Sequence, residues 1–165
     1  MKTITQGELK AKLAAHKLWL DSDKKEGERL VLVGYDLSGC YLYGCDLSGC
    51  YLYGCDLSEA NLSWVDLSGC DLSYCDLRGC NLDKSDLIGS NLSNAKGIFK
   101  IDNIGHDGDY TVFVQHADTI MVKTDRFWGD IISFRIHIMD TYKDDTYMCS
   151  VFSAAIELAK IQFSK

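Results

Sequence analysis

The stretch DLSGCYLYGCDLSGCYLYGCDL, residues 36–57, carries a leucine at every fifth position. The same spacing runs without a break from Leu32 to Leu92, through thirteen leucines. Side chains on one face lie three or four residues apart in a helix and two apart in a strand. A period of five fits neither and predicts a solenoid, in which each turn of the chain stacks on the turn before it.

The other positions of the five-residue repeat also keep a fixed character. The residue two before each leucine is small or apolar, as at Cys50, Ala60 and Val65, and is expected to point inward. The residue before the leucine is usually Asp or Asn, and the leucine is usually followed by Ser and often then by Gly. This composition suits a corner about every five residues, with these outer side chains in solvent.

Pentads such as Ala60-Asn61-Leu62-Ser63-Trp64 and Cys75-Asp76-Leu77-Arg78-Gly79 resemble the A(D/N)LXX consensus of the pentapeptide-repeat family. The resemblance implies a right-handed quadrilateral β-helix with four pentads per coil, in which Leu fills the axis and the small residue stacks beside it. Cys at the small position is a variation that this family tolerates. Thirteen pentads then give about three coils, a stack of roughly 15 Å at about 4.8 Å per coil.

The chain is expected to contain three segments: an N-terminal capping helix in residues 1–29, the pentapeptide-repeat β-helix in 30–95, and a C-terminal α+β segment ending in a helix in 96–165. An open coil exposes its core and unpaired edges, so both flanking segments are expected to be caps. Thr5 and Glu8 have the spacing of a capping box and predict a helix over residues 6–20. The segment around His16 and Trp19 resembles the leader of phage and prophage pentapeptide proteins, and these two residues are expected to be packing residues.

Beyond Leu92 the repeat decays and the pattern changes. Residues 110–115 and 119–124 alternate and predict a β-hairpin, with residues 126–129 as a candidate third strand. Residues 144–163 keep helical spacing and predict a final helix.

Residues 130–142 carry conflicting signals. Ile132, Phe134, Ile136 and Ile138 alternate as in a strand, while Asp130 is a good N-cap for a helix. The resemblance to the tails of phage pentapeptide proteins favours the helix.

Composition places the chain among small globular proteins, with 165 residues of which 47% are apolar. No apolar run approaches the roughly 20 residues of a membrane span, and the N-terminus lacks the apolar core of a signal peptide. A cytoplasmic location is therefore expected, in the host cytoplasm if a phage encodes the protein. Seven of the eight cysteines occupy the inward small position and are expected to be reduced thiols, with a disulfide between stacked pairs such as Cys50 and Cys70 as the alternative.

No set of residues predicts catalysis. The four histidines are scattered, and nucleophile motifs, phosphate-binding Gly-rich loops and zinc-ligand spacings are absent. We therefore expect no enzyme activity, no cofactor and no metal. Residues 105–109 contain two carboxylates, but they have the composition of a turn rather than the ligand number of a calcium loop.

A binding surface is instead predicted on the outside of the coil. The ten letters SGCYLYGCDL occur at residues 38–47 and again at 48–57, half a coil apart, so their tyrosine pairs are expected on opposite faces. Asp residues twenty apart are expected to stack in two columns. The candidate residues are Tyr41, Tyr43, Tyr51, Tyr53, Trp64, Asp36, Asp56, Asp76, Asp46, Asp66 and Asp86. The tyrosines equally fit a position beneath the terminal segments.

Residues 30–95 carry nine acidic residues and two basic ones, Arg78 and Lys84. The net charge of this segment is −7, which equals the net charge of the whole chain. The preferred function is a non-enzymatic protein-interaction module of phage origin that presents this acidic, Tyr-bearing surface to a host or phage protein, in one version inhibiting a host defence or nucleic-acid enzyme. No direct binding to nucleic acid or membrane is expected.

Two alternatives stay open. The family resemblance includes proteins that imitate duplex DNA, so an acidic DNA mimic competing for a topoisomerase or nuclease is one, although three Asp rungs span only roughly 10 Å, or about three base pairs. A self-assembling structural module, and hence a homo-oligomer, is the other.

Overall fold

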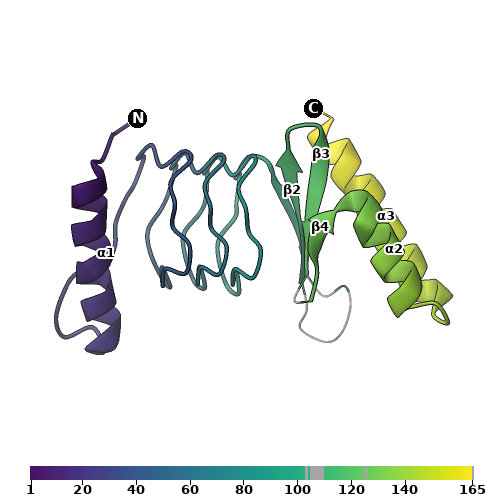
Figure 1. Cartoon of the computed structure of the whole chain (residues 1–165), viewed down its shortest axis with the longest axis horizontal. Coiled ribbons are helices and arrows are strands. Elements are labelled where there is room, and N and C mark those ends of the chain that lie inside the picture. Colours follow the sequence, from purple (N-terminus) through teal and green to yellow (C-terminus); the bar gives the residue numbers. More distant parts are fainter. Residues whose placement is uncertain (103, 105–109, 125, 165) are drawn as a thin grey trace. The chain divides into compact units, whose positions relative to one another are not determined.

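The computed structural model describes residues 1–102, 104, 110–124 and 126–164, so the predicted turn at residues 105–109 lies outside the described residues. The chain divides into two compact units, Met1–Lys96 and Gly97–Lys165. Unit 1 holds helix α1 (Gln6–Asp21) and the coiled repeat. Unit 2 holds strands β1 (Ile98–Asp102), β2 (Tyr110–His116), β3 (Thr119–Lys123) and β4 (Trp128–Asp130), and helices α2 (Ile131–Thr141) and α3 (Thr146–Phe163) (Figure 1).

Backbone pairing at intervals of twenty residues builds the coil of unit 1. Asp46, Asp66 and Asp86 form successive parallel bridges, and the same step recurs along each of the other walls. The N–H of Leu47 donates to the carbonyl oxygen of Asp66 (2.9 Å), and the N–H of Asp66 donates to that of Cys45 (3.1 Å). Twenty residues hold four pentads, so the rungs that stack in Figure 1 follow the predicted four-pentad coil.

Leucine fills the interior of this coil, as the five-residue period predicts. Twelve of the thirteen leucines, from Leu32 to Leu87, are at most 2% exposed, and the last one, Leu92, is half-buried. The small position is also internal over most of the coil, for example at Ala60 and Val65. Burying a leucine contributes about 1.5–3 kcal/mol, so this column is the main stabilising element of unit 1.

The cysteines of the coil make hydrogen bonds as well as filling space. Three buried thiols donate to the carbonyl oxygen of a leucine 23 residues earlier: Cys55 to Leu32 (2.6 Å), Cys70 to Leu47 (2.8 Å) and Cys75 to Leu52 (2.9 Å). All eight cysteines are free. Burial raises the pKa of another thiol of the coil, Cys80, and keeps it protonated.

Helix α1 begins with the predicted capping box. Its N-cap Thr5 accepts a hydrogen bond from the N–H of Glu8 (3.2 Å), and the Glu8 carboxylate accepts one from the N–H of Thr5 (2.9 Å). The helix ends at Asp21, which confirms the prediction of a helix over residues 6–20 within one residue.

His16 links α1 to the coil. The imidazole is fully buried, its Nδ1 accepts a hydrogen bond from the N–H of Leu30 (3.2 Å), and its Nε2 lies 3.2 Å from Cys50 Sγ. Because Nδ1 is an acceptor, the neutral ring carries its proton on Nε2 and directs it at the sulfur. The Trp19 ring stacks on the imidazole at 5.5 Å, so the prediction that His16 and Trp19 are packing residues is confirmed.

Unit 2 is an antiparallel sheet in the order β1-β2-β3-β4, with α2 and α3 packed on one face (Figure 1). The β2–β3 hairpin and the final helix are confirmed, and the third predicted strand begins at Trp128 instead of residue 126. Strand β1 was not predicted, because its five residues follow directly on the decaying repeat.

The conflict over residues 130–142 is resolved in favour of the helix. The Asp130 carboxylate accepts a hydrogen bond from the N–H of Ser133 (2.7 Å) and starts α2. Phe134 and Ile138, four residues apart, then pack into the core against Phe113 and Phe152.

The His16 environment predicts that unit 1 loses stability in weak acid. Burial lowers the pKa of His16, with Asp46 opposing and Arg29 adding to the shift. The unfolded chain therefore takes up a proton as the pH falls below about 6.5, while the folded chain resists it, so the unfolding free energy drops by at most about 1.4 kcal/mol per pH unit in that window. Urea unfolding at several pH values between 7.5 and 5 is the measurement.

The control for this prediction is His16→Asn, whose side-chain oxygen still accepts the Leu30 N–H. It should be less stable than the wild type at pH 7.5 but less sensitive to pH between 7 and 5.5. An equal pH dependence in both proteins would show that His16 is not responsible.

Candidate binding surface

The acidic residues of the coil have a structural task that explains their position but not their charge. Each Asp or Asn before a leucine accepts a hydrogen bond on Oδ1 from the N–H two residues later, as in Asp66 with Ser68 (2.8 Å) and Asn61 with Ser63 (3.1 Å). Asn81 and Asn91 make the same turn. The turn needs one amide or carboxylate oxygen, and either residue supplies it.

The two columns of carboxylates are therefore more acidic than the fold requires. Asp36, Asp56 and Asp76 stack on one wall, and Asp46, Asp66 and Asp86 stack on the opposite wall. A third wall carries Tyr41, Asn61 and Asn81 instead. Like charges placed directly opposite each other on paired strands are destabilising, so carboxylates in these two columns cost stability that Asn would not.

Two aromatic residues occupy corners where the repeat usually has glycine. Trp64 and Tyr74 both have a φ of +60°, and both side chains are exposed. A non-glycine residue in this left-handed conformation costs about 1–2 kcal/mol. Glu59 and Lys84 adopt the same left-handed conformation at the same position of other pentads, so the corner does not require an aromatic ring. Trp64 and Tyr74 extend the aromatic surface that the tyrosine pairs begin.

Two neighbouring walls and the corner between them combine these features, and we name them the Trp64 surface: Tyr41, Tyr43, Trp64, Asp46, Asp66 and Asp86. The Tyr41 and Tyr43 rings stack at 5.9 Å and are 75% and 49% exposed, and Trp64 is 56% exposed. Lys84 Nζ lies 5.5 Å from the Trp64 ring centre. Among the described residues, none forms an ion pair with the three carboxylates of this surface.

The opposite surface, the Tyr74 surface, contains Tyr51, Tyr53, Tyr74, Asp36, Asp56 and Asp76. The chain's own cations cover part of it. Arg29 places its guanidinium carbon 3.8 Å from the centre of the Tyr51 ring while its Nε donates to the carbonyl oxygen of Gly49 (2.6 Å). Arg78 forms an ion pair with Asp76, and its hydrogen bond lowers the pKa of that carboxyl group.

The structure thus distributes the predicted residues over two opposite surfaces and adds residues that sequence reasoning missed. Tyr53 contacts Tyr74 at 5.4 Å, and Arg29 covers Tyr51. The twenty-residue stride was the signal for both, because Arg29 lies twenty residues before Gly49 and Tyr74 lies twenty-one after Tyr53.

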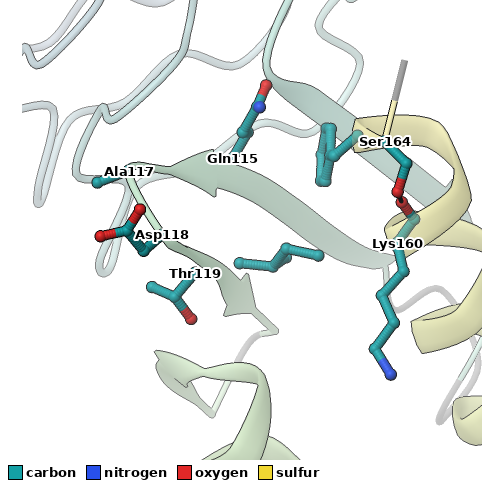
Figure 2. A pocket seen from close by; sticks show the side chains of 8 residues that line it. Gln115, Ala117, Asp118, Thr119, Lys160 and Ser164 are labelled. Atoms are coloured by element: carbon teal, nitrogen blue, oxygen red, sulfur yellow. Dashed lines mark hydrogen bonds between the residues drawn. The ribbon is translucent and has the colours of Figure 1, made fainter.

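Unit 2 contains a hollow of about 250 Å³ where the tip of the β2–β3 hairpin lies near the end of α3. Its lining comprises Gln115, Ala117, Asp118, Thr119, Ile120, Lys160, Phe163 and Ser164. Figure 2 shows Asp118 and Lys160 on opposite sides, and Lys160 already contacts Glu157 at 2.8 Å. Among the described residues that line the hollow, the Ser164 hydroxyl donates to the backbone carbonyl oxygen of Lys160 (2.6 Å) and not to a side-chain base.

Over the described part of the chain, no three His, Cys, Asp or Glu side chains gather as a metal ion requires. None of the described helices is both long enough and apolar enough to cross a membrane.

Replacing Asp66 separates its charge from its structural task. Asp66→Asn retains the oxygen that accepts the Ser68 N–H and removes repulsion within the column, so its unfolding free energy should stay within about 0.5 kcal/mol of the wild type. Asp66→Ala loses the hydrogen bond and should cost about 1 kcal/mol. Urea unfolding of the two variants measures the difference, and equal losses in both would mean that the fold itself needs the charge.

Comparison with known proteins bears on the coil. The family model for pentapeptide repeats matches residues 36–73 and 60–96, with eight copies. No curated protein matches the chain.

Several solved structures are similar over part of the chain. The pentapeptide repeat protein Rfr23 of the cyanobacterium Cyanothece 51142 is 33% identical over 41% of this chain and 47% of its own, with a TM-score of 0.40. A pentapeptide repeat protein of Nostoc Pcc 7120 is 27% identical over 50% of this chain and 72% of its own, with a TM-score of 0.29. One from the thylakoid lumen of Arabidopsis thaliana is 31% identical over 41% of this chain and 54% of its own, with a TM-score of 0.18.

The alignment thus spans less than half the length of the Cyanothece protein. The matched residues are those whose leucines, turns and twenty-residue pairing build the coil. Residues 36–96 therefore match the model for pentapeptide repeats, and this match implies a right-handed quadrilateral β-helix for this segment.

Proposed function

We propose that the coil is a non-catalytic protein-binding module, and that its Trp64 surface receives arginine or lysine side chains of a partner protein. The observation that carries this proposal is the contact of Arg29 with Tyr51. It is an example, within this chain, of a guanidinium group held by a tyrosine ring and a backbone carbonyl of the coil.

The duplicated decapeptide extends this example to the Trp64 surface. Tyr41 and Tyr51 occupy the same position in identical sequences, SGCYLYGCDL, half a coil apart. Arg29 covers Tyr51, whereas no cation of the described residues lies over Tyr41. A cation over an aromatic ring contributes about 0.5–2 kcal/mol, and the neighbouring Asp column adds attraction for the same groups.

The composition of the surface also fits protein recognition. Exposed Tyr and Trp side chains are enriched among residues that dominate binding energy, and they commonly pair with Arg. The net charge of −7 on residues 30–95 favours rapid association with a basic partner.

The duplication also supplies a matched control for the test. Tyr41→Ser with Tyr43→Ser should abolish capture of the partner from a bacterial lysate, whereas Tyr51→Ser with Tyr53→Ser, made in the same ten letters, should leave most of it. Replacing Asp46, Asp66 and Asp86 by Asn should weaken capture and reduce its dependence on salt. Quantitative mass spectrometry of the captured proteins is the measurement, and unchanged capture by the Tyr41 and Tyr43 variant would reject the Trp64 surface.

DNA mimicry is a second candidate, supported by the two straight columns of carboxylates. It predicts that the chain competes with DNA for a topoisomerase or nuclease, and that raising the salt concentration weakens the competition. Displacement of labelled DNA from such an enzyme measures it, with the Asp46, Asp66 and Asp86→Asn variant as the control. Absence of displacement at low salt would end this candidate.

We further propose that a phage encodes the protein and that its target is a host or phage protein. In this version the protein inhibits a host defence or nucleic-acid enzyme in the cytoplasm. Genes beside the coding sequence test it directly. An early phage region favours an inhibitor directed at the host, and a cluster of virion genes favours a structural role.

A further inference from the structure

Helix α2 has apolar side chains on two sides, and only one side is buried. Phe134 and Ile138 face the core of unit 2. Ile132, Ile136 and Met139 are 65–70% exposed, and their spacing of four and three residues places them in one stripe along the helix. A surface helix normally has one apolar side, and a helix that is apolar all round is normally buried all round.

Helix α3 carries a second exposed stripe. Phe152, Ile156 and Ala159 belong to the core, whereas Leu158 and Ile161 are 53% and 61% exposed. Five large aliphatic side chains on two helices are therefore left in solvent within one small unit.

An ion pair shows that the two stripes lie side by side. Arg135 lies between Ile132 and Ile136 in α2, Glu157 lies next to Leu158 in α3, and their side chains meet at 2.9 Å. Both residues are about half exposed. Residues three and four apart share a helix face, so the ion pair and the aliphatic side chains form one surface, the α2–α3 face: Ile132, Arg135, Ile136, Met139, Glu157, Leu158 and Ile161.

We infer that the α2–α3 face is an interface between two copies of this chain. A two-fold interface brings a surface against itself, so it must be self-complementary. The α2–α3 face meets this condition because Glu157 lies between two cations of its own copy, Arg135 (2.9 Å) and Lys160 (2.8 Å), so a two-fold pair can exchange these ion pairs between copies. The column of Asp46, Asp66 and Asp86 on the coil does not meet this condition, because like charges repel each other across a two-fold axis.

A partner of another kind fits this face less well. Helices that lie on membranes have Lys and Arg along their polar side, whereas α2 carries Asp140 as well as Arg135, and α3 carries Glu157 beside Lys160. The inference concerns unit 2 and is independent of the binding proposed for the coil. A dimer would carry two Trp64 surfaces and would strengthen binding to any partner with repeated sites.

Sedimentation equilibrium of the full chain over a wide range of protein concentration tests this inference. The wild type should form a dimer, and Ile132→Ser with Ile136→Ser should weaken the association at least tenfold. The matched control is Ile88→Ser, which removes an isoleucine of the coil that is 62% exposed and should leave the dimer unchanged. Far-UV circular dichroism verifies the fold of each variant, and Met139→Glu tests the same face from the other end of α2.

The charges give a second, independent readout. Arg135→Glu places two acidic side chains on each copy and should weaken the dimer, and adding Glu157→Arg should restore it. A wild type that stays monomeric at every concentration, or a dimer that survives both the isoleucine and the Arg135→Glu changes, would overturn the inference. Neither result would affect the Trp64 surface, because the Tyr41 and Tyr43 variant is expected to dimerise normally.

Discussion

The structure of unit 1 depends on backbone hydrogen bonding between residues about twenty apart. Bonds such as that from the N–H of Leu47 to the carbonyl oxygen of Asp66 fix each coil on the next and leave two side chains of each pentad inside, the leucine and the small residue. The interior is uniform because these two positions keep the same character along the coil. The same constraint stacks equivalent outer residues into columns. Any chemistry that is repeated at twenty residues therefore becomes a stripe on one wall.

In such a coil the identity of the outer residues is nearly independent of the identity of the inner ones. An outer residue that the turn does not require therefore indicates a role other than folding. Asp and Asn make the same turn, so the choice of Asp at positions 46, 66 and 86 is not a folding requirement. Trp64 in a left-handed corner is a further departure from what the fold prefers. The Tyr74 surface carries the same two features, but Arg29 and Arg78 cover part of it, whereas Arg29 does not contact the tyrosine pair of the Trp64 surface.

The sequence predicted the coil, α1 and the β2–β3 hairpin because each has a strong local period or cap. Strand β1 escaped because it is short and is defined by its pairing with β2, from Ile98 opposite Val114 to Asp102 opposite Tyr110, which no local pattern reveals. The ambiguity of residues 130–142 had a physical cause: the core side of α2 and its exposed stripe interleave in the sequence and imitate a strand. Arg29 and Tyr74 were missed because their contacts appear only when the chain is read in steps of twenty. The capping role expected for residues 96–165 stays a prediction.

The duplicated decapeptide has an evolutionary consequence for which wall of the coil each outer residue occupies. Inserting or deleting ten residues turns the part of the coil that follows by half a turn relative to the part that precedes it. Each later residue then lies on the wall opposite to its former one. Copying twenty residues would instead lengthen every column by one rung and preserve all angular relations. A lineage of such chains can thus lengthen its columns by whole coils, whereas changes of half a coil redirect the surface and should persist only where the partner tolerates either orientation.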